Sequence, residues 1–324
     1  MYYIGRMTQI DQWEEKSTRT GFLAECRREG VLGLVLGAGL SNEAGLPGWN
    51  ELLARMERRL KEKKQYYLER NEEINISEHL SNEERAGCIH KLFEDNEENY
   101  NRLVKDSLYD GKQSFLGSWD SFPTLNAISM LCTSIGSGYV NEVLTFNFDS
   151  VLEDHLIALG LDVNTHYSGS HKLGRCDVNV YHVHGYLPSY ESHDKMSKKI
   201  IFDTESFKEV MNKDWEWRRK SLLFFQQNIC LFIGLSGRDE NMGQLLSKAY
   251  EYRKKYHHTF DLFWGVSFAV NPNEEDLQRW MNWGIYPVVV SIKKGEKYSS
   301  DIVEELRMIS RYYPQLYRYN RLGL

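Results

Sequence analysis

The sequence has no excess of basic residues, no closely spaced cysteine pair and no long apolar run. Its 46 Asp and Glu outnumber its 40 Lys and Arg, giving a net charge of −6, so we expect no direct binding of nucleic acid. The five cysteines are scattered without CxxC spacing, which favours reduced thiols in a cytoplasmic protein and gives no zinc-ribbon ligand set. Apolar stretches fall short of the ~20 residues that cross a bilayer, and residues 1–13 lack a signal-peptide core, so no membrane segment is expected.

Proline is scarce too, with six in 324 residues, and no Ser/Gly-rich linker or internal repeat divides the chain. We therefore predict a single domain over residues 1–324. Residues 62–120 change to a composition rich in Glu, Asn and Lys, which indicates a helical insertion. A short helical tail is expected at 298–324.

Short apolar runs alternate along the chain with segments of helical periodicity. The runs at 31–36 and 229–233 are unbroken, as is typical of strands buried on both faces of a sheet. This alternation predicts an α/β fold with a doubly wound, Rossmann-like, mostly parallel sheet of about six strands. Residues 199–202 are expected to be short and extended. The predicted strands are 31–36, 141–146, 178–184, 229–233, 260–270 and 285–292.

The first candidate site is the turn Gly37-Ala38-Gly39, which follows a predicted strand and opens toward a helix. Glycines would let the backbone approach a diphosphate, and free N–H groups at a helix start attract anions. Ser41 or Asn42 could cap that helix. An ordinary tight turn would look the same, and the GK[ST] ending of a P-loop is absent.

The second candidate site lies at the end of the predicted strand 141–146. Strand alternation would put Asn147 and Asp149 on one side and Phe146 and Phe148 on the other. An amide and a carboxylate there can orient a sugar hydroxyl or a water molecule. The alternative is that Asp149 or Ser150 simply caps the next helix.

Two histidines, His182 and His184, form the third candidate site and share one face at strand spacing. Such a pair can bind a metal, but no third ligand is evident nearby, and we expect no metal. His184, followed by Gly185, suits a general base because its ordinary pKa lies near neutrality. His182 is better explained as a hydrogen-bonded core residue. A fourth candidate, Gly234 with Ser236, could admit a phosphate or ribose or could be an ordinary loop.

Taken together and in this order, these segments resemble the sirtuin family. Residues 37–47 resemble the signature G-A-G-x-S-x-x-A-G-[IL]-P, and residues 145–149 resemble T-x-N-x-D. His184 with Gly185 is similar to the catalytic H-G. Gly234 and Ser236 resemble a later G-x-S. Asn271 is similar to a ribose-contacting asparagine, although this match is looser.

The resemblance implies that NAD⁺ is consumed as a substrate. It implies a diphosphate over Gly37, Ala38, Gly39 and Ser41. Asn147 would hold the nicotinamide ribose or the attacking water, Asp149 would contact the ribose or the nicotinamide amide, and His184 would take a proton. Trp49 would cover the nicotinamide pocket, and the remaining ribose and phosphate contacts would come from Gly234, Ser236 and Asn271.

Two departures from the family pattern bear on the activity. Gly48-Trp49-Asn50 stands where protein-deacylating sirtuins have D-F-R, and the four-cysteine zinc module is absent. The segment 44–53 resembles bacterial sirtuin-like effectors associated with anti-phage defence. The resemblance therefore implies an NAD⁺ hydrolase that depletes NAD⁺. The alternatives are a protein deacylase or ADP-ribosyltransferase, and a non-catalytic module that binds NAD⁺ or ADP-ribose.

An enzyme that drains NAD⁺ must be held inactive until it is needed. Since only a short tail follows residue 292, we expect the sensor on a separate chain, together with assembly into a homo-oligomer. Similar domains occur beside HerA-type translocases and Argonaute-type proteins. The tyrosine-rich residues 312–319 could pack at an interface or on their own domain.

Overall fold

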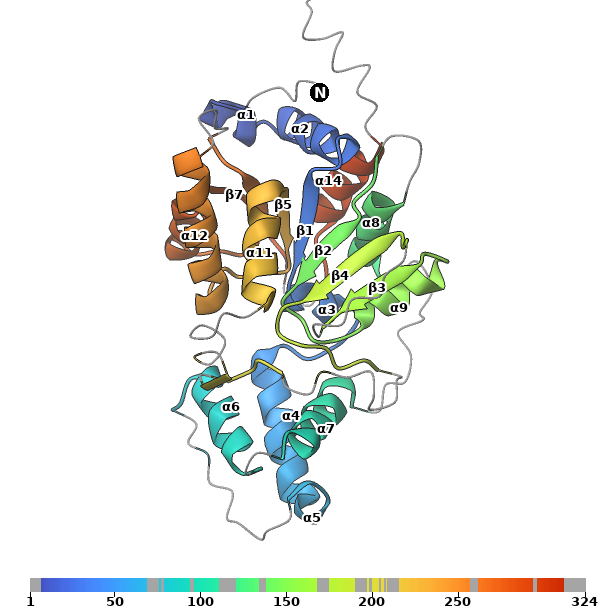
Figure 1. Cartoon of the computed structure of the whole chain (residues 1–324), viewed down its shortest axis with the longest axis vertical. Coiled ribbons are helices and arrows are strands. Elements are labelled where there is room, and N and C mark those ends of the chain that lie inside the picture. The colour runs from blue at the N-terminus through green and yellow to red at the C-terminus, as the bar shows by residue number, and fades with distance from the viewer. Residues whose placement is uncertain are drawn as a thin grey trace, which may run out of the picture.

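The computed structural model shows an open sheet flanked by helices, with a smaller group of helices at one end (Figure 1). The strands are β1 (Leu32–Leu36), β2 (Glu142–Thr145), β3 (Val163–His166), β4 (Val178–His182), β5 (Ile229–Ile233), β6 (Gly265–Val270) and β7 (Ile285–Val290). The helices are α1 (Ile10–Glu14), α2 (Lys16–Arg28), α3 (Ala38–Glu43), α4 (Trp49–Glu62), α5 (Lys64–Tyr67), α6 (Asn82–Lys91), α7 (Glu97–Tyr109), α8 (Pro123–Cys132), α9 (Val151–Ala158), α11 (Glu216–Gln227), α12 (Glu240–Tyr256), α13 (Glu274–Asn282) and α14 (Ser300–Arg311). The structure describes residues 7–68, 76, 79–93, 96–110, 121–133, 138–167, 175–189, 197, 200–203, 205–206, 208, 216–256, 262–293 and 296–311.

The described strands pair in parallel, in the order β3-β4-β2-β1-β5-β6-β7. From β1 the sheet extends to one side through β2, β4 and β3 and, later in the chain, to the other side through β5, β6 and β7. This confirms the predicted doubly wound sheet and puts β1 at the point where the winding reverses, which is where such sheets bind ligands.

The described residues form seven strands rather than about six. The missed strand is β3, which lies at the edge of the sheet next to β4. Its four residues are Val163, Asn164, Thr165 and His166, and three of them are only half-buried. An edge strand can carry polar side chains, so no apolar run marked it in the sequence.

Alternate residues of β1 contribute to two hydrophobic cores. Leu34 and Leu36 pack in the core that includes α2, α8 and α14. Val35 packs in the other core with Phe224 of α11 and Met242 of α12. All five residues of β1 are buried because helices cover both faces of the sheet. The unbroken apolar run therefore reflects cover on both faces.

Helices α4 to α7 form a lobe beyond the end of the sheet where the strands have their carboxyl ends (Figure 1). Helix α4 buries Leu52, Leu53, Met56 and Leu60, which recur at helical spacing. Its contacts are with α6 and α7, and the apolar cluster of the lobe is continuous with one core of the sheet. The lobe thus begins at α4, before the predicted insertion at 62–120.

Two further expectations concern membrane segments and the C-terminal tail. Within the described ranges, none of the helices combines the length and apolar character that a bilayer crossing demands. The predicted tail contains α14, which packs on α8 and α2. The tyrosine-rich residues 312–319 lie outside the described residues.

A buried ion pair ties the first long helix to the last. Arg19 of α2 donates from Nε and Nη2 to the two carboxylate oxygens of Glu305 on α14, each at 2.9 Å. Both side chains are almost fully buried. Arg19 Nη1 also donates to the carbonyl of Trp13, so the guanidinium is satisfied in three directions.

Replacing Arg19 with Met should lower the free energy of unfolding by about 3–5 kcal/mol, because Glu305 would be left as an unpaired buried charge. The double variant Arg19→Met/Glu305→Leu should recover most of that loss, since no charge is left buried. Urea unfolding of both variants would measure this. A loss below about 1 kcal/mol in the single variant would contradict a stabilising role for the pair.

Candidate functional site

A pocket of about 410 Å³ lies at the carboxyl ends of the central strands. That volume falls in the range of about 300–1,000 Å³ typical of small-molecule sites. The loops after β1, β2, β4 and β5 meet here because parallel strands share one carboxyl edge. The predicted residues that line the pocket are Gly37, Ala38, Ser41, Trp49, Asn147, Asp149, His184, Gly234 and Ser236.

The glycines of the turn after β1 make a loop contact that the sequence did not predict. A Cβ on Gly37 would lie 2.4 Å from Leu235, and one on Gly39 would lie 2.8 Å from Gly234. Gly39 N donates to Gly234 O at 3.0 Å, and Leu40 N donates to Gly37 O. The glycines therefore let two loops pack against each other, and these two N–H groups are already used.

Gly234 lies on the other side of this contact between loops, and its position also requires glycine. Its φ of +73° is left-handed, and a Cβ there would meet Leu40 N at 2.6 Å. A non-glycine residue would be strained in its backbone and would also clash. The predicted small-residue loop after β5 is thus half of one structure shared with the turn after β1.

Asn271 does not lie in the pocket. It is exposed at the end of β6, with a φ of +44°. Its side chain exchanges hydrogen bonds with the backbone of Ile292 at 3.1 and 3.3 Å. Its side chain joins the loops that follow β6 and β7, and the ribose contact of Asn271 stays a prediction.

The side chains after β2 do not alternate between two sides as predicted. Strand pairing ends at Thr145, and beyond it Phe146, Asn147, Phe148 and Asp149 all line the pocket. Since the segment has left the strand, a period of two no longer applies to it. Both the aromatic and the polar side chains of this segment therefore contribute to one surface.

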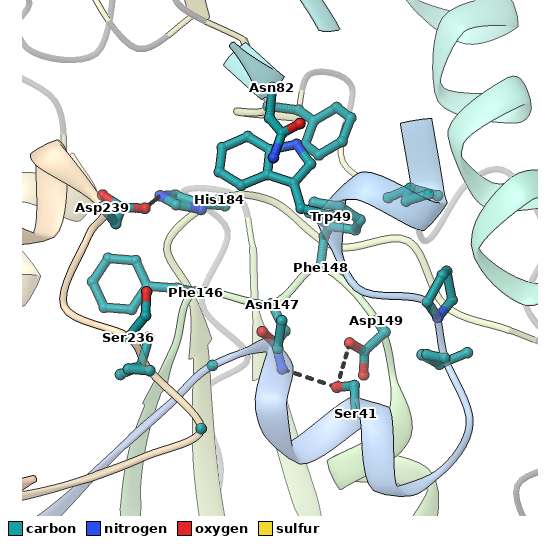
Figure 2. Close-up of a pocket in the computed structure, with 18 of the residues that line it drawn as sticks. Ser41, Trp49, Asn82, Phe146, Asn147, Phe148, Asp149, His184, Ser236 and Asp239 are labelled. Atoms are coloured by element: carbon teal, nitrogen blue, oxygen red, sulfur yellow. Dashed lines mark hydrogen bonds and ion pairs between the residues drawn. The ribbon is translucent and has the colours of Figure 1, made fainter. Parts of the chain in front are cut away.

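Ser41 joins the amide to the carboxylate (Figure 2). Its hydroxyl donates to Asp149 Oδ2 at 2.7 Å and accepts from Asn147 Nδ2 at 2.9 Å. The side chain of Asp149 faces the pocket and also accepts from Val151 N, at the start of α9, whose N-cap is Ser150. Ser41 lies inside α3, whose N-cap is Gly37, so its predicted capping role was wrong.

Burial raises the pKa of the Asp149 carboxyl above its ordinary value, and the hydrogen bonds from Ser41 and Val151 oppose that rise. The amide of Asn147 has a defined orientation, because its nitrogen must donate to Ser41. Its oxygen is turned away from that hydroxyl (Figure 2).

His184 is nearly buried at the start of the loop after β4. Burial lowers the pKa of its imidazole below 6.5, while Asp239, whose Oδ2 is 3.9 Å from Nε2, works against the shift. Phe146 packs edge-on against the ring at 5.1 Å. A neutral imidazole at neutral pH can accept a proton, and the nearby carboxylate would stabilise the resulting imidazolium.

The structure adds pocket residues that the sequence did not identify. Asp239 accepts from Met242 N at the start of α12 and also faces His184. Arg238 lines the pocket while bound to Asp276. Asn82 of the lobe lies beside Trp49 (Figure 2). Asn82 lies outside the sequence motifs, so they could not predict its place in the pocket.

Among the residues that the structure describes, no group of three or more His, Cys, Asp and Glu side chains is arranged to hold a metal ion. His182 is buried, and its two ring nitrogens contact Asn147 O and Glu153, so neither nitrogen is available to bind a metal. It is therefore the hydrogen-bonded core histidine that the sequence suggested.

Residues 141–288 match the family model of the SIR2-like domain. Over these residues the chain is similar to SIR2-like domains. The matched range begins at β2 and ends in β7, so it contains Asn147, His184 and the loop after β5. No curated protein matches the chain. The SIR2-like domain supports binding or use of NAD⁺ and is compatible with an NAD⁺-utilising enzyme.

Gly39→Ala should separate the two loops that form the floor of the pocket. We expect a loss of about 1–3 kcal/mol in the free energy of unfolding, because a methyl group must enter a filled space. We also expect weaker NAD⁺ binding by calorimetry. Gly87→Ala is a matched control inside α6, since its Cβ would meet nothing closer than 3.8 Å. Unchanged binding and stability in Gly39→Ala would contradict the loop contact.

Proposed function

We propose that this sirtuin-like protein is an NAD⁺ hydrolase that releases nicotinamide and ADP-ribose. The observation that carries the proposal is the convergence of Asn147, Asp149 and His184 with the glycine turn on one pocket. The match to a SIR2-like domain supports NAD⁺ as the ligand. The glycine turn by itself would not be sufficient support for NAD⁺ hydrolysis.

In the proposed reaction the bond between ribose C1′ and the nicotinamide nitrogen breaks, and its electron pair leaves with nicotinamide. Water bonds to C1′ and gives its proton to His184, which later releases it to solvent. Positive charge develops on the ribose during bond breaking, and the carboxylate of Asp149 is placed to stabilise it. Asn147 orients the ribose or the water.

The aromatic wall of the pocket supports a site for a flat ring. Trp49 stacks on Phe202 with ring centres 5.6 Å apart, and Phe148 packs edge-on against Phe202 at 5.5 Å. Ile201 N donates to His184 O, so this wall is joined to the loop that carries the proposed base. Such a wall would bind nicotinamide and limit which molecules reach C1′.

Two other functions use the same pocket. A protein deacylase or ADP-ribosyltransferase would pass the ribose to a protein acceptor instead of water. A non-catalytic module would bind NAD⁺ or ADP-ribose and leave it intact. We favour hydrolysis because Gly48-Trp49-Asn50 replaces the D-F-R of deacylating sirtuins and the four-cysteine zinc module is absent.

Purified protein mixed with NAD⁺ should release nicotinamide, measured by chromatography. Asn147→Ala and His184→Ala should each lower the rate by about 10²-fold or more, because each removes a group that acts on the reacting atoms. His79→Ala, at an exposed position outside the pocket, is the matched control and should keep full activity. Full activity in either pocket variant would refute its role.

The assay also separates the alternatives. Transfer to an acyl-lysine peptide or a protein, without free ADP-ribose, would favour the deacylase or transferase. Tight binding of NAD⁺ by calorimetry, with no turnover in any condition, would favour the non-catalytic module.

We further propose that the protein acts in anti-phage defence by depleting NAD⁺. Such an effector needs restraint, which supports a homo-oligomer and a separate sensor such as a HerA-type translocase. Light scattering after size-exclusion chromatography should give a mass that is a multiple of the chain, and the added partner should change NAD⁺ turnover. A monomer whose activity no partner alters would contradict this arrangement.

A further inference from the structure

His182 is the member of the two-histidine motif that the proposed reaction does not use. It ends β4 and is 1% exposed. Its Nδ1 lies 2.8 Å from the backbone oxygen of Asn147, and its Nε2 makes a short contact with Glu153 Oε1. Glu153 belongs to α9 and is also buried. One ring therefore links the chain after β2 to the next helix.

The two contacts define the hydrogens on the ring. A backbone carbonyl can only accept, so Nδ1 must carry a hydrogen and donate it to Asn147 O. Glu153, as an ionised carboxylate, can likewise only accept, so Nε2 then also carries one. A ring with both hydrogens is an imidazolium, and Glu153 is its counter-ion. The other carboxylate oxygen of Glu153 is buried with no hydrogen-bond partner, so the contact with His182 is what offsets that buried charge.

The surroundings agree with this protonation state. Asp149 and Glu153 are the carboxylates that face His182, and Tyr186 packs against the ring at 4.6 Å. Burial alone would lower the pKa of His182, but the attraction and hydrogen bond of Glu153, with the Asn147 carbonyl, raise it above 6.5. The pair as a whole is neutral, so it adds no net charge beside Asp149.

We propose that His182 is a positioning residue: as an imidazolium paired with Glu153, it holds the backbone of Asn147 and so sets where the Asn147 side chain meets the ligand. This inference rests on the proposed function, in which Asn147 orients the ribose or the water. Ser41 holds the amide group at the far end of the same residue. Asn147 is thus held at its backbone by His182 and by Thr145 Oγ1, which accepts from Asn147 N at 3.1 Å, and at its side chain by Ser41.

The protonation state can be tested without turnover. Besides His90, whose pKa Asp203 and Glu97 raise to about 9, nitrogen NMR of histidine-labelled protein at about pH 7.5 should show a second ring with both nitrogens protonated. That signal should be absent from His182→Gln, which identifies it. In Glu153→Gln the ring should become the neutral form with hydrogen on Nδ1, because the amide introduced at position 153 can donate to Nε2. A neutral His182 in the wild type would overturn the proposal.

The positioning role is tested by removing the whole pair. His182→Met/Glu153→Leu leaves no buried charge, so its free energy of unfolding should equal or exceed that of the wild type. The kcat for NAD⁺ cleavage should nevertheless fall about 10–100-fold with KM changed less than about threefold, because a small misplacement of Asn147 affects the transition state most. Glu153→Gln, which keeps the hydrogen bond to Asn147, should retain most of the activity.

Each outcome of the double-variant test supports or contradicts the positioning role of the His182–Glu153 pair. A stable double variant with wild-type kcat, or a double variant that does not fold, would show that the pair serves the core and not the site. Glu251→Gln, an exposed carboxylate on α12 outside the pocket, is the control and should leave both values unchanged. A wild type that cleaves no NAD⁺ with or without the added partner would refute the proposed function, while the NMR result would still decide the state of His182.

Discussion

The close approach of two loops at the centre of the sheet is the constraint on which the site depends. The turn after β1 and the loop after β5 meet glycine against glycine, with Gly39 N donating to Gly234 O. Neither side has room for a side chain. This contact holds α3 in place, and α3 carries Ser41 to the polar residues that follow β2. A change at either glycine would therefore move the polar groups as well.

The polar centre of the pocket is built from contacts between neighbouring strands. Ser41 comes from the chain after β1, Asn147 and Asp149 from the chain after β2, and His182 from the end of β4. Parallel pairing places these strands side by side. Each polar group is therefore held by a residue that follows or ends a different strand, which gives the fixed geometry that positioning a substrate needs.

The charges of the pocket are arranged by burial. Asp149 is a buried carboxylate whose cost is reduced by two hydrogen bonds, whereas Glu153 and His182 offset each other as a pair. His184 lies apart from that pair and closer to Asp239, and burial favours its neutral form. Two histidines separated by one residue thus occupy opposite protonation environments, which suits one to hold the chain and the other to take a proton.

The sequence by itself determined the alternation of strands and helices, because runs covered on both faces must be apolar throughout, as in β1. It also determined which motifs gather at one edge, since parallel strands share their carboxyl ends. It missed β3, an edge strand whose polar residues leave no such pattern.

Only the tertiary structure decided which side chains meet. Asn271 faces the backbone of Ile292, and Asp239 faces His184 across the sheet. The glycines of the turn after β1 serve a second loop, at Gly234, that lies far along the chain. Contacts between such distant segments depend on how helices pack on the sheet, and local periodicity carries no record of that packing.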